Sequence, residues 1–189
     1  MVWPESPVRR GLTARSGPRF HRGRQCEQTT EAMSQWRELE RRPANERHFE
    51  QLDRPEQRWP PMPDGRQRDP YLYADSHPDC VAHVWDFLGD TLPEDCRFLL
   101  LGRPVLAHPV SGFVFAMPHG TQYGLWIPEP EHTEATVAGL VPTMTWSGGG
   151  TTDLAAEFGE GWLFGKSRGE EVAWLAAAHV AAAVPPVPS

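Results

Sequence analysis

The glycine-rich run WSGGGTTD, residues 146–153, holds the residue types best suited to chemistry. Three successive glycines let the backbone approach a ligand closely and can point N–H groups at an anion. The run predicts a ligand site in the loop at 147–153. Its candidate residues are Ser147, Gly148, Gly149, Gly150, Thr151 and Thr152. A purely structural interpretation stays open, in which a flexible loop leads into a short helix capped by Thr152 or Asp153.

Two histidines, His108 and His119, flank the central apolar runs, each beside a turn. Histidine titrates near neutral pH and can act as a general base, with Asp153 or Tyr123 to orient it. No nucleophile motif accompanies them, because Ser111 lies in SGF and not in G-x-S-x-G. We therefore assign no catalytic residue, and His108, His119 and Asp153 remain candidates.

A second glycine-rich stretch, GEGWLFGKS at 159–167, ends like a phosphate-binding loop. The full motif places a glycine five residues before Gly165, and this chain has Glu160 there. The residues between are bulky and apolar, which is typical of a buried strand. The stretch predicts a strand followed by a polar turn at Lys166, and no nucleotide cofactor.

A zinc site would need four N or S ligands, and four candidates lie close enough in sequence to consider: His77, Cys80, His83 and Cys96. On a helix, however, successive residues turn by about 100°, which spreads the first three side chains over about 120°. Cys80 also borders the apolar stripe, where a free cysteine behaves as a small hydrophobe. The sequence therefore predicts no metal and no other cofactor.

Charge divides the 189-residue chain into two parts. Residues 1–70 hold 14 basic and 11 acidic residues, whereas residues 71–189 hold 4 basic and 14 acidic ones. The overall charge of -7 argues against binding to nucleic acid or to an anionic membrane. No apolar run reaches the roughly 18 residues of a spanning helix. Three sparse cysteines and the lack of an apolar leader indicate a cytoplasmic protein.

The N-terminal third lacks the pattern of a packed core. Residues 1–32 are rich in Arg and Pro without periodicity, which predicts a disordered tail, and Met33 is an alternative start. Residues 33–52 contain two stretches that favour helix, SQWRELERR and ANERHFEQL, broken by Pro43. Residues 53–70 form a proline-rich linker. We expect the folded domain to span residues 71–189.

From residue 71 onward the apolar pattern predicts an α+β domain with a mostly antiparallel sheet of about five strands between N- and C-terminal helices. SHPDCVAHVWDFLGD predicts a helix that starts at Ser76 and ends at Gly89. Residues 91–102 predict a second short helix, or alternatively a strand at 98–101. The five strands are expected at 104–108, 113–117, 123–128, 142–146 and 161–165, with helices near 131–140 and 170–184. The element order resembles that of the restriction-endonuclease-like core, but the acidic residue and the D/E-x-K motif that hold its metal are absent.

The central runs are apolar at nearly every position, although a sheet with one face in water alternates apolar and polar residues. Either the chain's own helices or a second copy of the chain must cover both faces. The second alternative names Leu106, Val114 and Trp126 as an exposed interface. We expect a non-enzymatic cytoplasmic interaction or immunity-like module that can self-associate. Its partner would be an unknown protein or a homodimer mate, and neither nucleic acid nor membrane.

The alternative is an enzyme or small-ligand binder that uses the loop at 147–153 with His108 or His119. The two hypotheses make different structural demands. An enzyme needs one of these histidines within a few ångströms of Asp153 in a concave pocket. An interaction module needs exposed apolar side chains at the sheet and no such pocket.

Overall fold

The computed structural model describes residues 36–53, 70–72, 75–165 and 171–186. Contacts along the chain group Gln35–Ser189 into one compact unit. The expected tail at 1–32, the alternative start at Met33, nearly all of the linker at 53–70 and the turn at Lys166 lie outside the described residues. None of the helices in the described ranges is long and apolar enough to cross a membrane.

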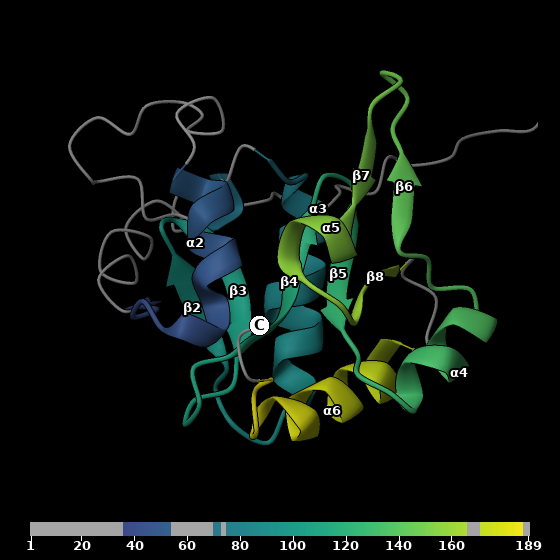
Figure 1. Cartoon of the computed structure of the whole chain (residues 1–189). Helices are drawn as coiled ribbons and strands as arrows, with labels where there is room; N and C mark the ends of the chain where they lie inside the picture. The colour runs from purple at the N-terminus through teal and green to yellow at the C-terminus, as the bar shows by residue number, and fades with distance from the viewer. Residues whose placement is uncertain (1–35, 54–69, 73–74, 166–170, 187–189) are drawn as a thin grey trace, which may run out of the picture. The chain divides into compact units, whose positions relative to one another are not determined.

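A six-stranded sheet forms the centre of the domain, in the order β1-β2-β3-β4-β5-β8 (Figure 1). Every neighbouring pair is antiparallel except β1 and β2, so the predicted α+β class is confirmed with one strand more than expected. The strands are β1 Arg37–Glu38, β2 Arg97–Leu100, β3 Arg103–Ala107, β4 Val114–His119, β5 Gln122–Trp126 and β8 Trp162–Gly165.

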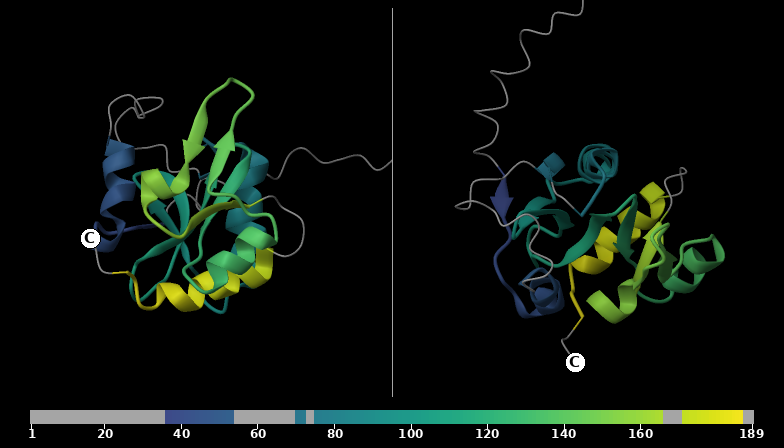
Figure 2. Two further views of the ribbon diagram at one scale, coloured as in Figure 1. Left: turned by 45° about the vertical axis from the view of Figure 1, so that its right-hand side comes forward. Right: turned by 90° about the horizontal axis from the view of Figure 1, so that it is seen from above.

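Helices cover both faces of this sheet, which explains why its strands are apolar on both sides (Figure 2). α2 (Glu46–Asp53) and α5 (Leu154–Phe158) contact each other, and α5 packs on β8. On the opposite face lie α3 (Pro78–Ala82) and the π-helix η5 (His83–Leu88), which packs on β3 and β4. α6 (Glu171–Ala182) contacts β4, β5 and η5, and α4 (Glu131–Val137) rests on α6. The chain's own helices, without a second copy, therefore bury the sheet.

The first expected helix forms, but with a different start and end. His77 caps α3, because its Nδ1 accepts a hydrogen bond from the Asp79 N–H at 3.3 Å. Ser76, predicted as the cap, instead forms an isolated bridge with Gly120. The helix does not stop at Gly89 either, since a 3-10 turn η6, Gly89–Thr91, continues it.

The second expected helix, at 91–102, is wrong, and its rival is confirmed. Leu99 and Leu100 are fully buried in β2, which pairs with β1 on one side and β3 on the other. An apolar run of four residues carries no period long enough to separate helix from strand. Sheet pairing decides it.

The domain also begins earlier than residue 71. The stretch SQWRELERR contributes β1 where we expected helix, whereas ANERHFEQL does form α2, after a 3-10 turn at Pro43–Asn45. Phe49 of α2 is 4% exposed and belongs to the main core. Asn45 fixes this segment to the sheet: its amide donates to the Gly112 carbonyl at 2.7 Å and accepts from the Val114 N–H at 3.0 Å. A further 3-10 turn, η4, spans Pro70–Leu72.

The turns of two tight hairpins lie at the same end of the central strands. Two residues, Leu101 and Gly102, join β2 to β3, and both have positive φ, at 49° and 86°. This is the backbone of a type I′ turn, which matches the twist of an antiparallel pair. Two residues also join β4 to β5. Because β3 and β4 are antiparallel neighbours, the first residue of β3 and the last of β4 lie side by side.

The expected strand at 142–146 forms as β6 (Thr143–Thr145), but outside the central sheet. It pairs with β7 (Thr151–Asp153) in a two-stranded hairpin that projects past the ends of the central strands (Figure 1). Val141, just before β6, bridges to Phe164 of β8. The base of the hairpin is thereby attached to the edge of the sheet.

Candidate functional site

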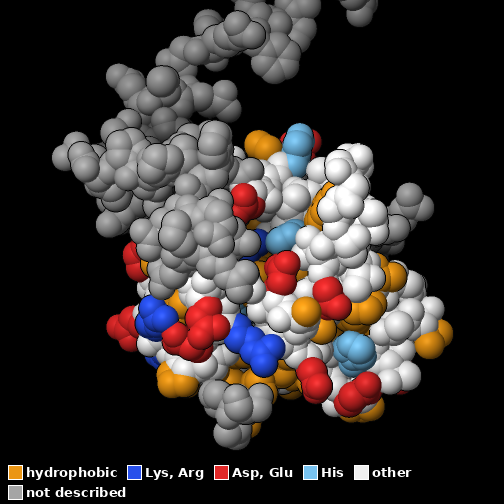
Figure 3. Space-filling view, turned by 45° about the horizontal axis from the view of Figure 1, so that its top comes forward, with side chains coloured by type: hydrophobic (Ala, Val, Ile, Leu, Met, Phe, Trp, Pro, Cys, Tyr) orange, Lys and Arg blue, Asp and Glu red, His pale blue; other side chains and the backbone are white. Residues whose placement is uncertain are grey.

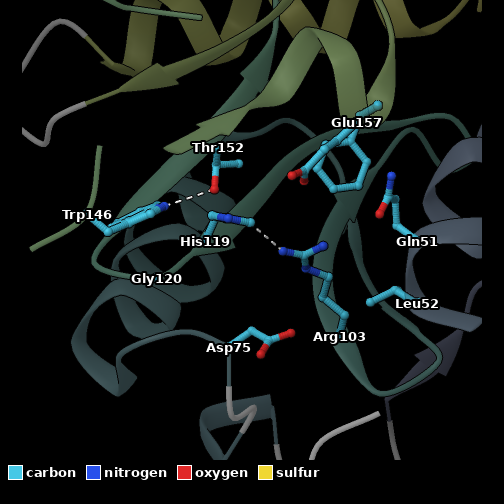
Figure 4. A pocket seen from close by; sticks show the side chains of 10 residues that line it. Gln51, Leu52, Asp75, Arg103, His119, Gly120, Trp146, Thr152 and Glu157 are labelled. Carbon is cyan, nitrogen blue, oxygen red and sulfur yellow. Dashed lines mark hydrogen bonds between the residues drawn. The ribbon is translucent and has the colours of Figure 1, made fainter. Parts of the chain in front are cut away.

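A cavity of about 360 Å³ opens where the two tight turns, the β6–β7 hairpin and the helices α2 and α5 meet (Figure 4). Segments more than 100 residues apart in the sequence contribute to it. Its lining consists of Gln51, Leu52, Asp75, Arg103, His119, Gly120, Trp146, Thr152, Glu157 and Phe158.

A buried arginine lies at the floor of the cavity. Arg103, the first residue of β3, is 3% exposed, and its Nη2 lies 2.9 Å from Nδ1 of His119, the last residue of β4. The guanidinium also lies 5.6 Å from the centre of the Phe158 ring. Burying a charged side chain is costly unless it is paired or hydrogen-bonded, so the surrounding polar groups must stabilise this guanidinium.

The Arg103 contact fixes the state of His119. A guanidinium carries only donors, so His119 Nδ1 must accept and the ring proton sits on Nε2. Burial, followed by the positive charge of Arg103, lowers the pKa of His119 to about 3. At neutral pH the ring is therefore neutral, with one nitrogen occupied by Arg103 and the other protonated. His119 can donate a hydrogen bond, but it has no free lone pair with which to act as a base.

The β6–β7 hairpin supplies the aromatic wall. Trp146 follows β6, and its indole Nε1–H donates to Thr152 Oγ1 of β7 at 2.9 Å. The indole ring packs against the rings of His119 and Phe164, at 5.8 and 5.9 Å. It also covers Gly120, where any added Cβ would meet Trp146 carbon at 2.8 Å. The short turn therefore needs glycine for space as well as for its positive φ of 58°.

Two carboxylates and an amide complete the lining of the cavity. Glu157 comes from α5 and Gln51 from α2, while Asp75 is held by its own carbonyl, which accepts the Gly120 N–H at 2.7 Å. Figure 3 shows acidic side chains gathered around a histidine and a basic side chain on this side of the domain. Leu52 and Phe158 add apolar surface. The cavity thus combines one fixed cation, two carboxylates and neutral donors with apolar walls.

Beside the cavity, His48 of α2 is buried without polar contact in the described part of the chain. Its ring stacks on Phe158 at 4.6 Å and meets Trp162 edge-on at 5.1 Å. The side chain is 2% exposed, and neither ring nitrogen has a hydrogen-bond partner among the described residues. Burial, with a smaller effect of the Arg103 charge, lowers its pKa to about 3. Leu52, one turn further along the same helix, lines the cavity.

The structure divides the residues that we predicted for the ligand loop. Only Thr152 of that set reaches the cavity. The tip of the hairpin is exposed, and a Cβ at Gly148, Gly149 or Gly150 would meet nothing within 4 Å. Thr151 faces its strand partner, Thr145, with the two hydroxyl oxygens 3.2 Å apart. Ser147 is exposed beside the tip. The glycines thus form the exposed turn of the hairpin, and the residues that line the cavity, Trp146 and Thr152, lie at its base.

The catalytic candidates are not brought together. Asp153 caps α5, because its Oδ1 accepts the Ala156 N–H at 3.1 Å, which confirms the structural interpretation of this residue. His108 Nδ1 accepts the N–H groups of Val110 and Ser111, both at 3.3 Å, and so stabilises the turn before β4. Of the three candidates, only His119 lines the cavity, and it is not a base. Neither His108 nor Asp153 lines the cavity, so the predicted pairing of a histidine with Asp153 is not formed there.

The four residues considered for zinc lie in different settings. His77 is an exposed helix cap, and Cys96 is fully buried beside β2. Cys80 donates its thiol to the Gln122 carbonyl, and burial raises its pKa to about 11. His83 instead faces Glu171 of α6, at 3.4 Å. No group of three or more His, Cys, Asp or Glu side chains in the described ranges is arranged to hold a metal ion.

The proposed interface residues are inside the protein. Leu106 and Val114 are fully buried and Trp126 is 6% exposed, with its indole N–H donating to the Glu160 carbonyl at 3.1 Å. Helices cover them from both sides of the sheet. An apolar interface at these positions would require opening the core, so they form no surface patch.

Sequence reasoning missed the central residue of the site, Arg103. Its signal was present: an arginine opens the otherwise apolar run RPVLA, directly after the Leu-Gly turn. Trp146 was assigned to a strand end, and Glu157 to a short helix, without any sign that the two face one cavity. No protein-family model matches the chain, and neither a curated protein nor a solved structure matches it.

Proposed function

We propose that the domain is a non-enzymatic binding module that holds a small polar ligand in the cavity above Arg103. The observation that carries this proposal is the buried Arg103–His119 pair at the floor of a cavity with an aromatic wall. A fixed cation and oriented donors at the end of a concave, partly apolar space are the features of small-ligand sites. The volume of about 360 Å³ lies at the lower end of the roughly 300–1,000 Å³ of such sites.

The state of His119 supports binding over catalysis. A general base needs a free lone pair and a pKa near the working pH. His119 has neither, because Nδ1 accepts from Arg103 and its pKa lies near 3. Cys80, with its pKa raised to about 11, is no more suited to act as a nucleophile. The acidic charge of residues 71–189 also favours a basic protein partner, because opposite charges attract across an interface.

The Trp146 indole is a built-in reporter for the test. Its N–H resonance can be assigned by comparing the NMR spectrum of the full chain with that of Trp146→Phe. We expect a saturable shift of this resonance with at least one member of a set of small acetates, phosphates, nucleosides, sugars and amino acids. Arg103→Met should weaken that binding at least tenfold, since a charge-assisted hydrogen bond contributes about 1.5–3 kcal/mol.

Two further variants keep the test decisive if Arg103→Met fails to fold. Glu157→Gln changes the cavity lining without changing size, and Gly150→Ala alters only the exposed hairpin tip, where a Cβ meets nothing within 4 Å. Binding that Glu157→Gln changes and Gly150→Ala does not supports the cavity as the site. Binding equally unaffected by all three variants, or no saturable shift with any compound, overturns the proposal.

A further inference from the structure

We propose that the ligand of this cavity is an uncharged, planar heterocycle with an amide-type edge, the chemical class of the free nucleobases and of nicotinamide. The inference rests on the proposed function and names its ligand class. It draws on three features of the lining: charged side chains that already interact within the protein, neutral groups that can still form hydrogen bonds, and an aromatic wall beside them.

The charged side chains of the lining already interact with other groups of the chain. Arg103 contacts His119 and the Phe158 ring. Arg103, Asp75 and Glu157 each have a further interaction of their own. A charged ligand would have to compete with these interactions or leave its own charge unpaired in a partly enclosed space, which is costly. A neutral ligand leaves them intact, so the lining favours a ligand without a formal charge.

Three neutral groups of the lining can form hydrogen bonds with such a ligand. The tautomer that Arg103 imposes on His119 leaves its Nε2–H as a donor. Thr152 Oγ1 accepts the Trp146 indole N–H, so its own hydroxyl proton can be donated. The Gln51 amide has no hydrogen-bond partner among the described residues, and it offers a donor and an acceptor side by side. Figure 4 shows that the three side chains reach the cavity from different elements, β4, β7 and α2.

These groups match the edge of a nucleobase or of a heterocyclic amide. At such an edge an accepting ring nitrogen or carbonyl oxygen lies next to an N–H group that donates, and a primary amide such as that of Gln51 can pair with both. Toward His119 and Thr152, which supply donors, the ring would present its remaining acceptors. Arg103 takes part in this arrangement through His119, whose donor it fixes.

The wall of the cavity favours a flat ring. Trp146 lies beside both donors, with its ring centre 5.8 Å from that of His119 and its N–H bonded to Thr152. Nucleobases stack on aromatic side chains because every base has a π-face. Leu52 adds aliphatic surface. The volume of about 360 Å³, at the small end of ligand cavities, suits a ligand of this size.

The experiment compares matched ligands on the full chain at pH 7.5. Isothermal titration calorimetry first ranks adenine, uracil and nicotinamide, together with glucose as a neutral ligand without an aromatic ring. Each ring is then compared with a counterpart that carries a carboxylate: purine-6-carboxylate for adenine, orotate for uracil and nicotinate for nicotinamide. We expect the tightest ring to bind at least tenfold more tightly than its counterpart and than glucose.

One variant tests the amide edge. Gln51→Leu removes the amide from a half-buried position of α2 and should weaken the tightest ring about tenfold, since two neutral hydrogen bonds are lost. Gly150→Ala, at the exposed hairpin tip, should leave its affinity unchanged. Unchanged affinity in Gln51→Leu overturns the amide edge.

The matched ligands keep the proposal falsifiable without any variant. A carboxylate counterpart that binds as tightly as its neutral ring overturns the uncharged assignment. If no ring binds but glucose or another compound saturably shifts the Trp146 resonance, the ligand class is wrong and the binding module stands. If nothing shifts that resonance, both proposals fail.

Discussion

The two faces of the central sheet differ in what surrounds their buried polar side chains. On the cavity face, under α2 and α5, Arg103 and His119 border a space of about 360 Å³. On the packed face, beside η5 and the start of α6, Tyr123 and Glu171 are 3% and 5% exposed. Neighbouring positions along β4 and β5 alternate between these two environments.

The polar groups of the packed face are placed by contact with one another. His83 Nε2 lies 3.4 Å from Glu171 Oε1, longer than a well-formed hydrogen bond, and the His83 ring rests 5.8 Å from that of Tyr123. Burial, then the negative charge of Glu171, raises the pKa of Tyr123. These groups tie α6 and η5 to β5. Burial of a polar group therefore does not by itself indicate a binding site, and it is the cavity beside Arg103 that supports one.

The largest effect is expected from filling space on the packed face. The Tyr123 ring crosses over Gly165 of β8, so that an alanine Cβ there would lie 2.2 Å from Tyr123 Cε2. Gly165→Ala should lower the free energy of unfolding by about 3 kcal/mol, the upper end for overpacking a core. Urea unfolding measures it, with Gly150→Ala as the matched control expected to change nothing. A loss below about 0.5 kcal/mol would show that this face yields as easily as the hairpin tip.

The second-largest effect should come from lowering the pH, which reduces the free energy of unfolding through buried histidines on the cavity face. His48 stays neutral in the folded domain with a pKa of about 3, whereas an unfolded histidine titrates near 6.5. Protonation therefore favours unfolding: the full stability is present above pH 6.5 and is lost as the pH falls toward 3. By pH 5 the loss is about 2 kcal/mol for this residue. His119, with its pKa also lowered to about 3, contributes in the same direction.

Replacing His48 tests this assignment directly. His48→Leu should roughly halve the loss of unfolding free energy between pH 7.5 and pH 5. At pH 7.5 it should leave stability equal or higher, because both ring nitrogens lack hydrogen-bond partners among the described residues. Urea unfolding at the two pH values measures both quantities. An unchanged pH dependence in the variant would show that His48 titrates normally and that the cavity face is open to water at this residue.

The sequence was sufficient for most elements of the fold and for few residues of the site. Apolar runs bounded by Gly and Pro marked β3, β4, β5 and β8, because burial on both faces leaves an uninterrupted signal. Short apolar runs gave a wrong prediction at 91–102, because Cys96 and Leu99 fit one face of a helix as well as a strand. β1 has two residues, too few for any period, and only its partner β2 places it.

The cavity could not be read from the sequence because its parts meet only through pairing. His119 and Thr152 were named, yet nothing local connects either of them to Arg103. That connection depends on the β3–β4 register and on the hairpin leaving the sheet at Val141. The glycines drew attention to the wrong end of the hairpin, since flexibility predicts a turn as readily as a ligand loop.

The smallest effect should come from the hairpin itself. Thr152→Val removes the acceptor of the Trp146 indole N–H at nearly constant volume. Both side chains are half-buried, so water can reach the released N–H, and the cost should be about 1 kcal/mol or less. Urea unfolding and the Trp146 indole resonance measure stability and hydrogen bonding separately. A cost above about 2 kcal/mol would mean that the indole is sealed from water, and that the cavity face is as closely packed as the face under η5.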